Sequence, residues 1–156
     1  MELYHILYNN LSMKMKITKF YKDAIIPTYQ TKGAAGFDFC AHLSEPYIMQ
    51  PGEIHAFDTG VGVEIPDGYE LQIRSRSGLA YKHYISLLNG IGTIDSDYRG
   101  EMRVLLKNYG DKEFVVEPGM RIAQGVVAKY EHIEFEEVDG LPETNRSGGF
   151  GSTGLK

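Results

Sequence analysis

The stretch Val61-Gly-Val-Glu-Ile-Pro-Asp-Gly-Tyr-Glu-Leu-Gln-Ile-Arg74 decides the fold class of this chain. Apolar residues occupy alternate positions on either side of Pro66-Asp67-Gly68, which has the composition of a turn. Alternation with a period of two is the signature of half-buried strands. It predicts one strand over residues 61–65 and a second over residues 69–74.

The same pattern of short strands between turn residues continues outward from this stretch. Pro51-Gly52, Gly110-Asp111 and Pro118-Gly119 are further turn signals. No apolar helical periodicity is sustained, and the one expected helix is short, over residues 77–84. The spacing of the turns predicts an all-β sandwich or barrel. Further strands are expected over residues 15–20, 37–41, 54–57, 102–107, 114–116, 122–127 and 133–138.

The composition narrows the class of protein. The chain has 156 residues, of which 42% are hydrophobic and 24% charged, as is typical of one globular domain. A net charge of −5 argues against sequence-blind nucleic-acid binding and against a basic membrane anchor. No apolar run approaches the ~18 residues that cross a bilayer. The single Cys40 excludes an internal disulfide and indicates a reducing compartment, so we expect a cytoplasmic protein.

Glycine and arginine are distributed together. Eighteen residues are glycine, well above the usual share of ~7%. Every arginine lies in or beside a glycine-rich stretch, whereas the lysines are scattered. Because arginine binds phosphate through a planar, bidentate group, this predicts a polyphosphate site assembled from distant segments; surface arginines without a role are the alternative. The arginines are Arg74, Arg76, Arg99, Arg103, Arg121 and Arg146.

Two carboxylate segments also stand beside glycine, namely Ala35-Gly36-Phe37-Asp38 and Ile94-Asp95-Ser96-Asp97-Tyr98. A carboxylate next to bound phosphates can orient water or hold hydrated Mg²⁺. Either segment alone is also compatible with an aspartate that only stabilises a turn.

The last residues, 146–156, have no strand or helix pattern and predict a flexible, glycine-rich C-terminal arm. A disordered terminus without a role is the alternative, but Arg146, Phe150 and two hydroxyl groups are side chains that can bind a phosphorylated nucleotide. The literal GxGxxG match over residues 149–154 is not a dinucleotide fingerprint, because that signal requires a preceding strand and a following helix.

Taken together, five segments resemble the five ordered motifs of the trimeric dUTP diphosphatases, or dUTPases. The similarity runs from about Met15 to Gly154. It divides the chain into an N-terminal extension (1–14), a β domain (15–145) and a mobile C-terminal lid (146–156). The segments are Ala-Gly-Phe-Asp (35–38), Arg-Ser-Gly-Leu-Ala (76–80), Gly-Thr-Ile-Asp-Ser-Asp-Tyr-Arg-Gly-Glu (92–101), Gly-Met-Arg-Ile-Ala-Gln (119–124) and Arg-Ser-Gly-Gly-Phe-Gly-Ser-Thr-Gly (146–154).

The resemblance implies a jelly-roll β fold and a homotrimer with shared active sites. It also implies hydrolysis of dUTP to dUMP and pyrophosphate with Mg²⁺, which keeps uracil out of DNA and supplies dUMP for dTMP synthesis. Neither nucleic acid nor a membrane is an expected partner.

The resemblance also implies a role for each matching residue. Asp95 is the expected general base, Tyr98 is expected against the deoxyribose, and Asp38 steadies the hydrated metal through water. Uracil would contact Asn89, Gly92, Thr93, Ile94 and Arg103. The phosphates would contact Arg76, Ser77, Gly78 and Gln124. The lid would close through Arg146, Phe150, Gly151, Ser152 and Thr153.

Physical arguments agree with these roles. Asparagine presents a donor beside an acceptor, which matches the edge of uracil. A tight hairpin around Asn89 would leave no space for the methyl group of thymine. Three features depart from the family pattern. Ser75 stands where most members have proline, and Met120 stands where the fourth motif usually has aspartate. Many cellular members also have one more residue between the arginine and the phenylalanine that correspond to Arg146 and Phe150.

Two alternative functions remain open. A dCTP deaminase shares the fold, but it would need a glutamate on the strand after the third motif, where this chain has Leu105. A non-catalytic, nucleotide-sensing interaction protein could also use the same fold. Release of pyrophosphate from dUTP separates the three.

Overall fold

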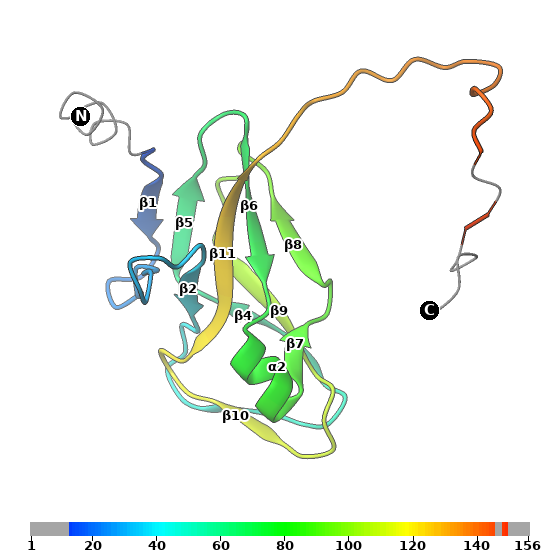
Figure 1. The fold of residues 1–156 in the computed structure, drawn as a ribbon. Helices are drawn as coiled ribbons and strands as arrows, with labels where there is room; N and C mark the ends of the chain where they lie inside the picture. Colours follow the sequence, from blue (N-terminus) through cyan, green and yellow to red (C-terminus); the bar gives the residue numbers. More distant parts are fainter. Residues whose placement is uncertain (1–12, 146–147, 150–156) are drawn as a thin grey trace.

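The computed structural model describes residues 13–145 and 148–149. Short strands dominate this part of the chain and one short helix interrupts them, so the predicted all-β class is confirmed (Figure 1). The elements are β1 (Lys16–Lys19), β2 (Phe37–Cys40), β3 (Tyr47–Met49), β4 (Ile54–Asp58), β5 (Val61–Glu64), β6 (Tyr69–Arg74), α2 (Ser77–His83), β7 (Ile85–Leu87), β8 (Ile91–Ile94), β9 (Arg103–Asn108), β10 (Phe114–Val116) and β11 (Arg121–Lys129).

Four sheets carry the fold, and their strands pair antiparallel throughout. The largest has the order β2-β11-β6-β8, and the second has the order β4-β9-β7. The pairs β1-β5 and β10-β3 complete the set. In Figure 1 the long strand β11 runs through the centre of the largest sheet, and α2 lies at one end of it. The described helix is not long and apolar enough to cross a membrane.

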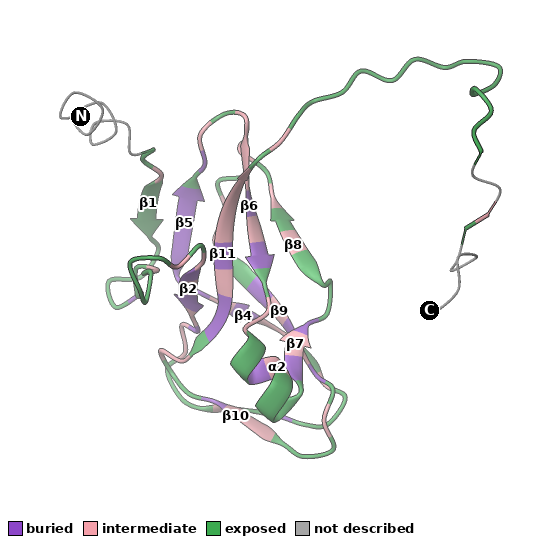
Figure 2. Ribbon diagram, in the orientation of Figure 1, coloured by how far each residue is buried: buried purple, intermediate pink, exposed green. Residues whose placement is uncertain are grey.

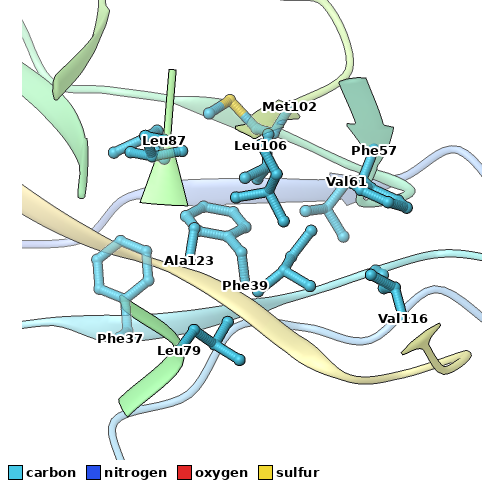
Figure 3. Close-up of a cluster of buried hydrophobic side chains, with 14 of the residues drawn as sticks. Phe37, Phe39, Phe57, Val61, Leu79, Leu87, Met102, Leu106, Val116 and Ala123 are labelled. Atoms are coloured by element: carbon cyan, nitrogen blue, oxygen red, sulfur yellow. The ribbon is translucent and has the colours of Figure 1, made fainter. Parts of the chain in front are cut away.

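The hydrophobic core forms where the inner faces of these sheets meet. Phe39 of β2, Phe57 of β4 and Leu106 of β9 are at most 1% exposed, and Figure 3 shows them in one cluster. Burying a side chain of this size contributes about 1.5–3 kcal/mol. Along β2 and β6 buried positions alternate with less buried ones (Figure 2), and Asp38, Gln72 and Arg74 are among the less buried positions of the sheet β2-β11-β6-β8.

Most predicted strands are confirmed, and those over residues 69–74 and 114–116 have the predicted bounds. The sequence pattern missed β3, β7 and β8. Each has only three or four residues, too few for alternation to be recognised, and β8 contains Gly92. The predicted division into extension, domain and lid stays a prediction.

The predicted strand over residues 133–138 is wrong for the isolated chain. This segment is extended and leaves the body of the molecule after β11 (Figure 1), without pairing to a described strand. Ile133 is 70% exposed and Phe135 is 88% exposed. A strand needs a partner for its N–H and C=O groups, so alternation alone does not create one here.

Candidate active site

A cluster of charged side chains lies at one edge of the sheet β2-β11-β6-β8. We name Asp38, Arg76, Arg121 and Gln124 the phosphate cluster. The Asp38 carboxylate is at its centre, with Oδ2 2.9 Å from Arg121 Nη1 and Oδ1 3.4 Å from Arg76 Nε. The Asp38 side chain is only 12% exposed, and a carboxylate so far from water needs such partners.

Backbone contacts fix the rest of the cluster. Arg76 Nη1 donates to the carbonyl oxygen of Arg121 at 2.7 Å, and Gln124 Nε2 donates to that of Ser75 at 2.9 Å. The Ser75 hydroxyl oxygen also accepts from the Leu87 N–H at 2.9 Å, so the serine that replaces proline is held on two sides. A Cβ on Gly36 would lie 2.6 Å from Gln124 Oε1, which explains the glycine in the first motif.

Cys40 follows Asp38 on the same face of β2 and lies opposite Arg121. Burial raises the pKa of the Cys40 thiol, and the neighbouring Asp38 carboxylate raises it further. The thiol therefore stays protonated at neutral pH and is a poor nucleophile.

The opposite edge of the same sheet carries the third motif. We name residues 89–98 the β8 edge, because β8 ends the sheet. An edge strand presents unpaired N–H and C=O groups along its free side. A nucleobase has complementary donors and acceptors, so the β8 edge offers a backbone template for one.

Asp95 lies immediately after β8 and is exposed. It lines a pocket of about 530 Å³ together with Glu70, Thr93, Ser96, Asp97, Tyr130 and His132. The Asp95 carboxylate is thus open to solvent and to a ligand, as a group that activates water has to be.

A tight loop fixes Tyr98 beyond Asp95. The Tyr98 N–H donates to the Asp95 carbonyl at 3.1 Å, and the Tyr98 hydroxyl donates to the Glu101 carbonyl at 2.9 Å. A Cβ on Gly100 would lie 2.6 Å from Tyr98 Cζ, so only glycine lets the ring fold across this loop. The Glu101 carboxylate accepts from the Gly60 N–H at 2.7 Å and ties the loop to the body.

The turn at residues 88–90 joins two different sheets. β7 pairs with β9, whereas β8 pairs with β6. Gly90 has φ +70°, and the Ile91 N–H donates to the Asn89 carbonyl at 2.8 Å. Asn89 Nδ2 would be 3.4 Å from a Cβ on Gly92. The structure therefore places these two predicted uracil contacts side by side.

Arg103 lies at the start of β9, near this turn, because the Leu88 N–H donates to the Leu105 carbonyl at 3.0 Å. Its guanidinium is engaged elsewhere, with Nε 2.7 Å from Asp58 Oδ1. The structure does not bring Arg103 onto the Asn89 side chain through a hydrogen bond, and its uracil contact stays a prediction.

The two edges are far apart within one chain. Asp38, Gln124, Arg74 and Ile91 form one row across the sheet, and Asp95 is four residues beyond Ile91. Strand spacings of ~4.8 Å and a rise of ~3.3 Å per residue separate Asp38 from Asp95 by about 20 Å. We name the two groups the half-sites; within one chain they lie apart on the same sheet.

The predicted site residues divide between these half-sites. The structure brings Asp38, Arg76 and Gln124 together, and Ser77 and Gly78 follow as the first two residues of α2. Asn89, Gly92, Thr93, Ile94, Asp95 and Tyr98 share the β8 edge. The lid residues Arg146, Phe150, Gly151, Ser152 and Thr153 lie outside the described residues.

Sequence reasoning counted Arg121 among the arginines of a polyphosphate site without giving it a role of its own, and it missed Glu70 and His132. Arg121 contacts both Asp38 and Arg76, and its position in the fourth motif beside Gln124 was the available signal. Glu70 and His132 share the pocket of Asp95 although no motif marks them. Gln72 Nε2 donates to Glu70 Oε1 at 2.6 Å and fixes that carboxylate beside the pocket.

The described residues include no group of three or more His, Cys, Asp or Glu side chains that could hold a metal ion. Mg²⁺ usually keeps several waters and binds through one or two carboxylates plus the phosphates of a substrate. Asp38 fits such an indirect role, because each of its oxygens already pairs with an arginine and can still accept from metal-bound water.

This fold and these half-sites define a class: an all-β protein in which arginines gather at one edge of a sheet and an exposed aspartate lies at the opposite edge. The comparison with known families gives the same result. The model of the dUTPase family matches residues 22–154. The chain therefore belongs to the dUTPase family.

Individual relatives cover nearly the whole chain. Deoxyuridine 5'-triphosphate nucleotidohydrolase of Nautilia profundicola is 54% identical over 143 residues, which are 91% of this chain and 99% of the relative. The protein of the same name from Orientia tsutsugamushi strain Boryong is 49% identical over 148 residues, 92% of this chain and 100% of the relative. Among solved structures, Staphylococcus bacteriophage 80alpha dUTPase with dUPNHPP has a TM-score of 0.82 and 25% identity, covering 92% of this chain and 100% of that chain.

Proposed function

We propose that the chain hydrolyses dUTP to dUMP and pyrophosphate at sites formed by the phosphate cluster and the β8 edge. The activity is that of a dUTP diphosphatase, which keeps uracil out of DNA and supplies dUMP for dTMP synthesis. The observation that carries the proposal is the position of both half-sites on one sheet, with arginines at one edge and an exposed aspartate at the other.

Asp95 acts as the general base. Its carboxylate accepts a proton from water while the water oxygen attacks the α-phosphorus. The bond between the α-phosphorus and the bridging oxygen breaks, and pyrophosphate leaves. The guanidinium of Arg76 and the amide of Gln124 hold the phosphates, with Ser77 and Gly78 beside them, so that the water meets the phosphorus in line.

The β8 edge selects the nucleoside. Asn89 and the backbone of residues 92–95, with Arg103 nearby, read the uracil edge. The Tyr98 ring, fixed by its bond to the Glu101 carbonyl at 2.9 Å, lies against the sugar and leaves no room for a 2′-hydroxyl. Arg146, Phe150, Gly151, Ser152 and Thr153 close over the bound nucleotide and exclude water.

Asp38 is the residue that would steady Mg²⁺, through water. The ion, when bound to the triphosphate, supplies charge neutralisation on the phosphates. Asp38 also keeps Arg76 in place through their ion pair.

We infer that the enzyme is a homotrimer with shared active sites. The base and the phosphate cluster lie about 20 Å apart in one chain, which favours a site to which two copies contribute. The segment after β11 provides a way to join copies, because Ile133, Phe135 and Leu141 are 70%, 88% and 85% exposed on an extended backbone. Docking on a neighbour would bury these side chains and carry the lid to another chain's site.

Mixed trimers test the shared site. Chains with Asp95→Asn and chains truncated before Arg146 are each expected to be inactive. Unfolding them together in equal amounts and refolding should restore about a quarter of wild-type activity, because every mixed cyclic trimer contains one site with an intact Asp95 and an intact lid. A mixture that is trimeric by light scattering and yet inactive would reject the shared site.

The dCTP deaminase alternative is not favoured. Leu105 occupies the strand position where the deaminase needs a glutamate, and its carbonyl is engaged with the Leu88 N–H at 3.0 Å. Assaying dUTP and dCTP side by side for pyrophosphate and ammonia distinguishes the two enzymes. A protein that binds dUTP without releasing pyrophosphate would be the non-catalytic sensor.

We also infer a cytoplasmic location from the single, protonated Cys40. Cell fractionation with an antibody to the chain tests this location.

A further inference from the structure

Arg121 contacts two predicted site residues through two different groups. Its guanidinium Nη1 lies 2.9 Å from Asp38 Oδ2, and its main-chain carbonyl accepts from Arg76 Nη1 at 2.7 Å. The Asp38 carboxylate is therefore shared by two arginines, and one of these arginines is also held by the backbone of the other.

A β-bulge puts Arg121 in this position. Arg121 lies opposite Cys40 and Ala123 lies opposite Phe39, so Ile122 is an extra residue in β11. Ile122 and Ala123 are consecutive and yet both buried, at 1% and 0% exposure. In a regular strand, residues three apart point to opposite faces. The bulge lets Arg121 share the outer face with Gln124, which lies opposite Asp38.

The same contacts restrict the Arg76 side chain before any ligand binds. A guanidinium has five N–H donors. Among the described residues, Arg76 contacts Asp38 through Nε and Arg121 through Nη1, which leaves Nη2 for an anion. Because long side chains lose rotamer freedom when they bind, an arginine that is already fixed loses less of it on meeting a phosphate.

We propose that Arg121 is a positioning residue of the phosphate cluster: it holds Asp38 with its guanidinium and Arg76 with its carbonyl, so that Arg76 meets the triphosphate in a fixed orientation. This inference rests on the proposed dUTP hydrolysis. Arg121 acts on substrate binding through its contacts with Asp38 and Arg76.

The test compares Arg121→Gln, Arg121→Lys and Lys129→Gln. Lys129→Gln is the matched control, because it removes an exposed cation at the other end of the same strand. Arg121→Gln should raise the KM for dUTP about tenfold, the effect expected for one charge-assisted hydrogen bond, and change kcat by less than about threefold. Arg121→Lys keeps the ion pair with Asp38 and should recover part of the loss. Lys129→Gln should match wild type.

A readout that depends on phosphate separates positioning from a purely structural role. The Ki of deoxyuridine, which has no phosphate, should be unchanged in Arg121→Gln, whereas the Kd of a non-hydrolysable imido analogue of dUTP should rise about tenfold. Equal weakening of both ligands, or an unchanged KM with only a lower Tm, would overturn the proposal. If Arg121→Gln does not fold, the same two constants, the Kd of the imido analogue and the Ki of deoxyuridine, are measured on Arg121→Lys. A rise in the Kd alone then supports the proposal, and an equal rise in both overturns it. A wild-type chain that releases no pyrophosphate from dUTP would instead reject the proposed function.

Discussion

The two edges of the sheet β2-β11-β6-β8 are built in opposite ways. In the phosphate cluster the side chains bind one another, and the Asp38 side chain is only 12% exposed. On the β8 edge the contacts go to main-chain carbonyls, among them those of the Tyr98 N–H and hydroxyl, and Tyr98 remains 43% exposed. Under the proposed function, the charges that would receive a polyanion are thus fixed in advance, whereas the groups that would meet the nucleoside and the water stay open. The difference suggests that substitutions at the first edge act mainly on KM, and substitutions at the second on kcat and selectivity.

The largest effect is expected for Asp95→Asn. The side chain is exposed, so the fold should be unaffected. Loss of the general base should lower kcat by at least about 10² with little change in dUTP binding. Pyrophosphate release and equilibrium binding measure the two quantities. Turnover close to wild type would contradict the role of Asp95.

Gly36→Ala should act mainly on the KM for dUTP rather than on kcat. The new Cβ would lie 2.6 Å from Gln124 Oε1, so the Gln124 amide has to shift, which weakens its 2.9 Å bond to the Ser75 carbonyl. We expect the KM for dUTP to rise about tenfold, with a smaller change in kcat. Gly33→Ala is the control, because a Cβ there meets nothing within 4 Å. Equal kinetics of the two variants would remove Gln124 from the phosphate cluster.

Gly100→Ala probes selectivity on the β8 edge. Its Cβ would displace the Tyr98 ring, so UTP should compete better with dUTP. We expect the ratio of kcat/KM values for dUTP and UTP to fall by a factor of about three or more. An unchanged ratio, with Gly33→Ala again as the control, would exclude Tyr98 as the group that rejects the ribose.

The smallest effect is expected at Lys16 and Glu64, which join β1 to β5 and belong to neither edge. The hydrogen bond from Lys16 at 3.0 Å lowers the pKa of Glu64 below its ordinary value of 4.5. This contribution to stability is present above that ordinary pKa and is lost as the pH falls through the lowered one. Lys16→Gln should therefore destabilise the chain slightly at pH 7 and by less at pH 3, with KM and kcat unchanged. Unfolding curves at both pH values check this, and an equal loss at pH 3 would contradict it.

The sequence predicts well those features that depend on residues close together in the chain. The strand over residues 69–74 was predicted with its bounds because alternation is a local property. The segment 133–138 alternates in the same way and is not a strand, because no described strand pairs with it. Whether a segment pairs depends on a partner strand far away in the sequence, and the alternation within the segment does not specify that partner.

The site shows the same limit. The motifs identified Asp38, Arg76 and Gln124, and the structure brings them together. The contacts of Arg121 depend on a bulge, and a bulge changes the register without leaving a clear mark in the residue types. The ion pair of Arg103 with Asp58 joins β9 to β4 and was likewise beyond any local pattern.

The turn at residues 88–90, which passes from one sheet to the other, limits how this enzyme can evolve. A residue inserted or deleted there would shift β7 against β9 or β8 against β6, and a shift by one residue turns every side chain of a strand to the opposite face. A protein with such a shift would lose both its buried hydrophobic core and the arrangement of its site residues. Changes in nucleobase preference are therefore accessible mainly through replacement of single side chains in the turn, and its length should vary less among descendants than that of the loop over residues 109–113.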